Sequence, residues 1–483
     1  MATAVATFED RQRALAERLG PTAPVDLETA TVVVLPSATF PVAELRKITG
    51  IQFYEERMLF TLLFLRRPGV RVVYVTSLPV DEAVVEYYLG FLPDPGGARR
   101  RLTMVALDQA GPVALAEKLV GRPDVLARLR AAVAGDDDAF LLPFIVTAAE
   151  RSVSDSLGLA LYGPPPELAV LGSKSGARRV AERAGVPLLA GAGDLWSLAE
   201  VDTATEALAA RRPAPAAVVV KLNDGFSGQG NAIVELGAPP AGGLVDRPTT
   251  FCAAGESWPS FAAKLAAGGG IVEELVRQAD LRSPSTQVHI AASGRAEVLS
   301  THDQVLGGPH NHVYLGCRFP ADGRYRAAIS EAAGRVAEVL AADGVIGSFG
   351  IDWVVAPGGG DGITLSEINL RMGGTTHPYW MARLVTGTAL DATTGELSGP
   401  GGPRAYQASD NLKSARLVGR APADVIAAVA GSGLAFDPAR GTGACLHLLG
   451  AVREFGKMGV TSIAPGPAAA ESLYDEVVAL LTD

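Results

Sequence analysis

The amino-acid sequence predicts an α/β (α+β) protein with three domains. Its 483 residues are 48% hydrophobic, which is far more chain than one small core requires. In the first third, short apolar runs alternate with amphipathic stretches, a pattern typical of a mostly parallel sheet covered by helices. Later apolar runs follow one another between glycines and prolines, as in antiparallel sheets. We therefore place the domains at residues 1–165, 166–400 and 401–483.

The first domain is predicted to be Rossmann-like. Its apolar runs indicate strands at 31–36, 71–78, 102–107 and 140–146. Stretches with helical spacing lie between them, at 54–67 and 113–133. No GxGxxG follows the first strand, so we do not predict a dinucleotide site there.

In the second and third domains, glycine and proline residues mark the predicted limits of the helices and strands. A helix starts at Lys174 and is closed by Gly185 before Pro187, and the Pro/Ala-rich segment 211–217 is a connector. Strands are then expected at 217–222, 231–236, 270–276, 286–292, 296–301, 349–356 and 363–370. After the Gly/Pro-rich run at 395–403 come a helix at 423–431, a strand at 443–449 and a closing helix at 468–482.

Charge and cysteine usage exclude several classes of protein. With 42 basic and 52 acidic side chains the net charge is −10, which is the wrong sign for a general nucleic-acid binder. The three cysteines, Cys252, Cys317 and Cys445, lie far apart without a CxxC pair, which argues against a disulfide framework and fits a reducing compartment. We see no secretory signal and no apolar stretch of about 20 residues, so we expect no membrane contact and a cytoplasmic location.

A glycine-rich strand-loop-strand segment follows Lys221. Gly225, Gly228 and Gly230 would let backbone N–H groups approach phosphate oxygens, while the ammonium of Lys221 neutralises their charge. No GK[ST] follows, and the loop leads into a strand, so this is not a Walker loop. A glycine-rich hairpin with a solvated lysine is the alternative interpretation.

Acidic residues stand within two apolar strands. Alternation places Glu367 and Asn369 on one face of their strand, and Asp352 on the neighbouring strand can reach that face. Two carboxylates and an amide oxygen suit Mg²⁺ held together with phosphates. Arg371 follows on the same face, where it can hold a phosphoryl group or an oxyanion. A salt-bridged strand edge is the alternative, which the poor strand propensity of these residues disfavours.

Glu273 and Glu274 end another apolar strand. Its backbone groups can contact an adenine edge, with a carboxylate near the amino group, although a solvated acidic pair explains the same pattern. In the segment 300–321, Gly-Gly-Pro separates His302 from His310 and His312, and no cysteine stands among these histidines, so a pocket loop is favoured over a zinc site.

Taken in order, these segments resemble the ATP-grasp superfamily over residues 165–400. The resemblance implies an ATP-grasp fold with a pre-ATP-grasp domain before it, a Gly-rich-loop subdomain at about 190–275, and a small α/β domain after it. It implies that ATP and Mg²⁺ (or Mn²⁺) bind here, with Asp352, Glu367 and Asn369 as metal ligands. It further implies an ATP site formed by Lys174, Lys221, Phe226, Ser227, Gly228, Gln229, Gly230, Asn231, Glu273, Glu274, Leu275, Val276 and, on the ribose, Asp280.

Within the superfamily the chain looks most like the pheganomycin-type peptide ligases. That resemblance implies an acylphosphate-forming carboxylate–amine ligase in natural-product biosynthesis, which joins an amino acid-like acid to an amino acid or peptide amine and releases ADP and phosphate. Arg371 and Arg318 would be catalytic, and His302, His310 and His377 would line the substrate site, whereas we expect His289 and His447 to be structural. A small-molecule kinase and a non-catalytic ATP-binding module remain alternatives, and a homodimer is left open.

Overall fold

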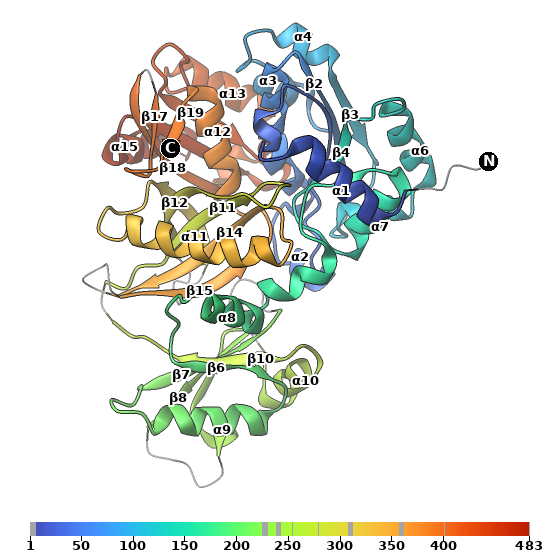
Figure 1. Ribbon diagram of the computed structural model, residues 1–483. Helices are drawn as coiled ribbons and strands as arrows, with labels where there is room; N and C mark the ends of the chain where they lie inside the picture. Colours follow the sequence, from blue (N-terminus) through green and yellow to red (C-terminus); the bar gives the residue numbers. More distant parts are fainter. Residues whose placement is uncertain are drawn as a thin grey trace, which may run out of the picture.

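The computed structural model describes residues 6–224, 230–237, 243–253, 255–278, 280–307, 313–356, 362–399 and 401–482. Three sheets organise the chain (Figure 1). The first belongs to the N-terminal third, the second forms a separate lobe, and the third joins the middle of the chain to its C-terminal part. None of the helices described is long and apolar enough to cross a membrane.

The first sheet is parallel, with strand order β3-β2-β1-β4-β5. Its strands are β1 (Thr29–Leu35), β2 (Gly69–Thr76), β3 (Leu102–Ala106), β4 (Ala139–Pro143) and β5 (Ala160–Leu161). The helices of this part are α1 (Phe8–Leu19), α2 (Val42–Leu45), α3 (Glu82–Leu89), α4 (Pro95–Arg100), α5 (Leu115–Val120), α6 (Pro123–Ala132) and α7 (Ala148–Leu157). The strand order reverses between β1 and β4, the position at which ligands bind in open parallel sheets.

The four strands predicted in the first domain are confirmed, and the two helical stretches differ in detail. Residues 113–133 form two helices, because Pro123 cannot continue α5 and instead starts α6 after Gly121. Residues 51–66 form one long 3₁₀ helix, η2 (Ile51–Arg66), most of whose second half is buried.

The second sheet is antiparallel, with strand order β6-β10-β7-β8-β9. It contains β6 (Gly191–Leu195), β7 (Ala217–Leu222), β8 (Asn231–Glu235), β9 (Thr249–Phe251) and β10 (Gly270–Glu274), with helices α9 (Leu198–Ala209) and α10 (Trp258–Gly268). Before it, the 3₁₀ helix η3 (Pro166–Gly172) leads into α8 (Lys174–Arg183). Helix α8 packs against β6 and β10 and also against β15 of the third sheet, so it bridges the two sheets (Figure 1).

The third sheet is antiparallel and contains β11 (Pro284–Ile290), β12 (Ala296–Gly307), β13 (Val313–Phe319), β14 (Gly347–Val355), β15 (Ile363–Asn369), β16 (Ala389–Asp391), β17 (Glu396–Gly399), β18 (Gly402–Lys413), β19 (Gly443–His447) and β20 (Lys457–Ala464). Its helices are α11 (Arg326–Ala342), α12 (Thr376–Thr386), α13 (Pro422–Gly431), α14 (Val452–Phe455) and α15 (Pro467–Thr482). Strand β18 pairs with both β13 and β20, so this sheet runs through the boundary predicted near residue 400.

Candidate active site

A β-bulge decides which side chains of β15 face the site. Leu365 and Ile368 are both buried in the core beneath α11, although they are an odd number of residues apart. The register with β14 shifts between them: Asp352 pairs with Glu367, while Trp353 pairs with Leu365. The extra residue turns Glu367 and Asn369 to the face opposite the core, beside Asp352. The predicted common face of these three residues is confirmed, because directly paired residues share a face.

Asp352 is held by two amide groups. Gln304 donates from Nε2 to Oδ1 at 2.7 Å, and Asn369 donates from Nδ2 to Oδ2 at 3.0 Å. Burial and the neighbouring Glu367 raise the pKa of Asp352 to about 6. Asn369 in turn accepts from the Arg371 guanidinium at 2.6 Å, so these side chains form one connected set. Sequence reasoning missed Gln304, because it lies beyond the strand predicted at 296–301 and β11 separates its strand, β12, from β14.

Glu367 is paired with the first lysine of the predicted ATP site. Lys174 lies 2.6 Å from it, and this lysine is placed by the start of α8, which is capped by the Ser173 hydroxyl. Burial opposes ionisation of Glu367, but Lys174, with Arg371 and Lys221 nearby, holds the pKa of its carboxyl below its usual value. The influence of these three cations shows that they converge on one carboxylate from three different elements.

The second lysine lies on β7 and is paired with Glu273 of β10. Arg178 of α8 lies 3.6 Å from the same carboxylate, which is only 3% exposed. Arg178 is the second functional candidate that sequence reasoning missed. It stands four residues after Lys174, on the same face of α8, and that spacing is the signal that could have found it.

The site therefore gathers four cationic side chains around three carboxylates, Asp352, Glu367 and Glu273. Among the residues that the structure describes, no three His, Cys, Asp or Glu side chains gather as metal ligands. The candidate set for a metal has two carboxylates and one amide, all presenting oxygen. Such a set fits Mg²⁺, which takes one or two carboxylates and completes its shell with water and phosphate oxygens.

The predicted adenine hinge, residues 273–276, starts in the last two residues of β10 and continues beyond it. The Glu274 carboxylate accepts from the Ala190 N–H at 3.0 Å, and the N–H groups of Glu274 and Leu275 donate to the carbonyls of Ala190 and Ala217. Val276 is half-buried, and Asp280 is exposed with a left-handed backbone, φ 65°. The hinge is thereby fixed to its neighbours at its start and opens toward solvent after Val276.

The glycine-rich loop is described only at its edges. Phe226, Ser227, Gly228 and Gln229 lie outside the described residues. Gly230 accepts from the Leu222 N–H at 2.9 Å, and Asn231 pairs with Lys221 in the sheet. The two ends of the predicted phosphate loop therefore meet beside Lys221.

Two residues predicted to act in catalysis or substrate binding are not brought to this cluster. Arg318 is about half-exposed and pairs with Glu471 of α15. His302 is fully buried against Phe319 and Tyr406, and burial lowers its pKa to about 3. We therefore leave both out of the proposed site.

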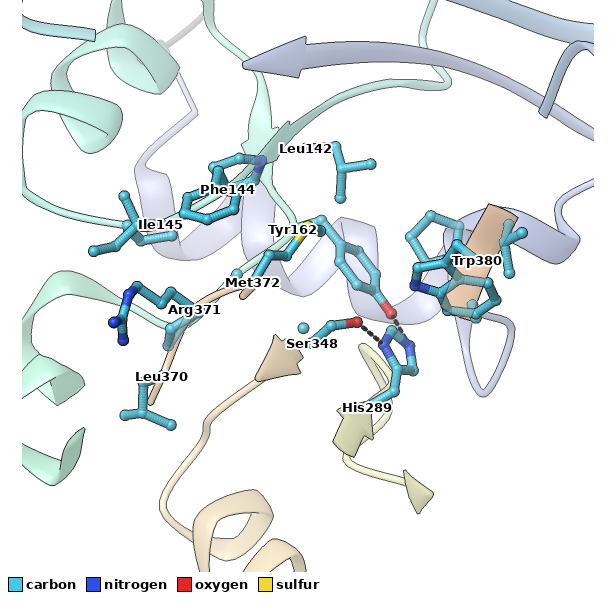
Figure 2. A pocket seen from close by; sticks show the side chains of 18 of the residues that line it. Leu142, Phe144, Ile145, Tyr162, His289, Ser348, Leu370, Arg371, Met372 and Trp380 are labelled. Carbon is cyan, nitrogen blue, oxygen red and sulfur yellow. Dashed lines mark hydrogen bonds between the residues drawn. The ribbon is translucent and has the colours of Figure 1, made fainter. Parts of the chain in front are cut away.

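His377 is also part of the interior, where its Nε2 lies 2.9 Å from Asp410. His447 is buried and bonded to Tyr88 and Thr461, as expected of a structural residue. His289 is buried too, but it lines a cavity beside Arg371 (Figure 2). His310 and His312 lie outside the described residues.

Two family models match the chain. The ATP-grasp domain matches residues 249–375, and the PGM1 C-terminal domain matches residues 424–477. The chain is also 32% identical over 468 residues to the L-propargylglycine–L-glutamate ligase of Streptantibioticus cattleyicolor, with 94% of each protein covered.

Solved structures share the fold at low sequence identity. Biotin carboxylase from Campylobacter jejuni, in a β,γ-ATP complex, superimposes with a TM-score of 0.55 at 14% identity, covering 92% of this chain and 89% of its own. N5-carboxyaminoimidazole ribonucleotide synthetase from Thermus thermophilus gives a TM-score of 0.51 at 16% identity, covering 94% of this chain and 99% of its own.

The fold and the lysine–carboxylate site thus define an ATP-grasp enzyme, which uses ATP. An ATP-grasp site can serve several reactions. The relative from Streptantibioticus cattleyicolor, which matches 94% of the chain, indicates which class of reaction this protein catalyses. The chain belongs to the family of pheganomycin-type ATP-grasp peptide ligases, and it is an ATP-dependent carboxylate–amine ligase.

Proposed function

We propose that this enzyme joins two amino acids, or an amino acid and a short peptide, through an acylphosphate. The relative in Streptantibioticus cattleyicolor is named for L-propargylglycine and L-glutamate, which supports a small apolar amino acid and glutamate as the first substrates to test here. The observation that carries the proposal is the convergence of Lys174, Lys221 and Arg371 on the pair Asp352 and Glu367.

The first step would be phosphoryl transfer. A substrate carboxylate oxygen attacks the γ-phosphorus of ATP, the bond to the β-phosphate oxygen breaks, and ADP leaves. Lys174 and Lys221 would hold the phosphates against their mutual repulsion, since catalysis of this step rests on positioning and charge neutralisation. Asp352, Glu367 and Asn369 would hold Mg²⁺ or Mn²⁺, which supplies further charge neutralisation when bound.

The second step would form the amide. The amine attacks the acylphosphate carbonyl, the bond to phosphate breaks, and the leaving phosphate takes up the proton that the amine loses. Arg371 is placed to stabilise the oxyanion of the tetrahedral intermediate, because its guanidinium adjoins the metal set through Asn369.

We propose the Val276 N–H as the hinge donor to adenine, since the N–H groups before it are already bonded.

Some expectations stay predictions. Asp280 on the ribose, the loop Phe226 to Gln229 over the phosphates, a homodimer, a cytoplasmic location and a role in natural-product biosynthesis rest on the resemblance and on sequence patterns.

Removal of the central charges should abolish ligation. We expect Glu367→Gln and Lys221→Met each to lower amine-dependent ADP release by at least about a hundredfold, because each loses an interaction with the transferring phosphoryl group or its metal. The measurement is ADP and phosphate release with Mg·ATP and pairs of amino acids, with mass spectrometry on the same samples. Glu471→Gln is the matched control, since it removes a carboxylate from an exposed pair on α15.

The products separate the alternatives. A product whose mass is one water less than the combined mass of its two substrates, formed together with ADP and phosphate, establishes the ligase. ADP without free phosphate and a product heavier by a phosphoryl group would make the enzyme a kinase. Normal turnover by either site variant would contradict the assignment of these residues.

A further inference from the structure

A cavity lies beside Arg371, where the first and third sheets meet (Figure 2). The space among its walls that the centre of a water molecule can occupy is about 30 Å³. The walls come from several parts of the chain: residues 23–25, η2, residues 142–146 at and after the end of β4, residues 162–164, β11, the start of β14, residues 370–372 and α12. Most are apolar, including Phe60, Phe64, Leu142, Phe144, Met372 and Trp380.

The polar groups inside the cavity are bonded to one another. His289 Nε2 lies 2.9 Å from the Tyr162 hydroxyl, and its Nδ1 lies 2.9 Å from the Ser348 hydroxyl (Figure 2). Burial lowers the pKa of His289 to about 4, so the ring is neutral near pH 7. Among the described residues that line the cavity there is no carboxylate, and Arg371 is the one cation. A basic side chain entering it would lose its hydration and face Arg371, and an acidic one would compete with Asn369 for that guanidinium.

The cavity lies on the same sheet face as the candidate metal ligands. Ser348, Gly350 and Asp352 alternate along β14, so they point to one side, and Ser348 is about 13 Å from Asp352 at the usual rise per residue. Gly350 pairs with Asn369, and continuing that register brings Arg371 opposite Ser348. Arg371 therefore stands between the candidate metal ligands and the cavity, and it lines the cavity itself.

We propose that this cavity binds the uncharged, apolar side chain of one of the two amino acids that the enzyme joins. The inference rests on the proposed function, because it takes Arg371 as the end of the site where the reacting carbonyl lies. With the carbonyl at Arg371, the substrate's side chain extends along the sheet face into the cavity. The apolar walls favour aliphatic side chains over polar ones, at about fourfold in kcat/KM for each methylene that the cavity buries.

The test measures amide formation by the wild-type enzyme with a panel of L-amino acids in pairwise combination. The panel contains alanine, norvaline, norleucine, phenylalanine, asparagine, aspartate and glutamate. Phe144→Val should enlarge the cavity and raise kcat/KM for phenylalanine relative to norvaline by at least about tenfold. Ile145→Trp, at a half-buried wall position, should fill the cavity and lower kcat/KM for the longer side chains by about tenfold, with the KM for ATP unchanged.

Phe349→Val is the matched control. Phe349 follows Ser348 on β14 but faces the core beneath α11, so its truncation should leave the side-chain preference as in the wild type. The cavity variants should change the side-chain preference for only one of the two substrates. That substrate, either the amino acid that yields the carbonyl or the one that yields the amine, is the one that occupies the cavity.

Two results would overturn the inference but leave the ligase activity established. The first is equal kcat/KM for charged and apolar side chains of similar size in both substrates. The second is amide formation whose side-chain preference is unchanged in both cavity variants. The absence of any amide product from every pair, with the wild-type enzyme binding ATP, would overturn the proposed function and this inference together.

Discussion

Asp410 shows how a single buried charge is accommodated in the interior. It is 2% exposed, with the Arg57 guanidinium 2.7 Å from one oxygen and His377 2.9 Å from the other. Burial opposes its ionisation, but these neighbours hold the pKa of the carboxyl well below its usual value. Sequence reasoning assigned His377 to the substrate site. Its partner Asp410 lies thirty-three positions away, and no sequence pattern reveals that the two side chains meet in the interior.

Asp410→Asn should destabilise the protein by about 3–5 kcal/mol, since it leaves Arg57 buried without its counter-charge. Urea unfolding at pH 7 measures the free energy of unfolding. Asp437→Asn is the control, because its arginine partner is exposed and surface pairs contribute about 0–1 kcal/mol. Equal stability of the two variants would show that Arg57 finds another partner.

At the scale of elements, the sequence predicted the strands that bear the candidate site residues better than the strands of the C-terminal part. The strands β7, β10, β14 and β15 were recognised because each has an apolar run, and their polar residues stood out against it. Strands β18 and β20 were missed. Strand β18 contains Pro403, Asp410 and Asn411, which are all poor strand formers, and β20 is interrupted by Gly459 near its start. The bulge in β15 was not predictable either, because alternation alone assumes an unbroken register.

Helix α8 offers a prediction at this scale, because it positions both Lys174 and Arg178. A Cβ on Gly176 would lie 1.9 Å from the Val170 carbonyl oxygen, so Gly176→Ala must push α8 away from η3. We expect a rise of at least about tenfold in the KM for ATP and a lower melting temperature. Gly334→Ala is the control: it lies in α11 with nothing within 4 Å, and should stabilise the protein by up to about 1 kcal/mol with an unchanged KM. An unchanged KM in Gly176→Ala would show that α8 can shift without moving its lysine.

At the scale of the whole molecule, the site is shared between distant parts of the chain. Arg371 lies over the Phe40 ring, 5.3 Å from its centre, so the loop after β1 reaches the third sheet at the crevice where strand order reverses. The candidate nucleotide-binding residues lie in local motifs, which is why a sequence pattern can propose them. The cavity has no such signature, since its walls come from segments that only the tertiary fold brings together.

The first and last parts of the chain are joined by a carboxylate whose protonation should affect stability. Glu56 of η2 is 4% exposed and accepts from the Gly450 N–H at 3.0 Å. Burial raises the pKa of Glu56 to about 7, against about 4.3 in an unfolded chain. Between these values the folded state binds more protons than the unfolded state, so this group's contribution to stability falls as the pH rises from about 5 to 7.

Glu56→Gln removes that titration, so the free energy of unfolding of the variant relative to the wild type should rise by about 1–3 kcal/mol between pH 5 and pH 8. Urea unfolding across this range measures the difference, and its slope with pH is unaffected by any constant cost of placing an amide beside Gly450. Glu454→Gln, an exposed position on α14, should follow the wild-type curve. A difference between Glu56→Gln and the wild type that does not change with pH would mean that Glu56 stays ionised in the folded protein, and that the junction between the two parts accommodates a buried charge.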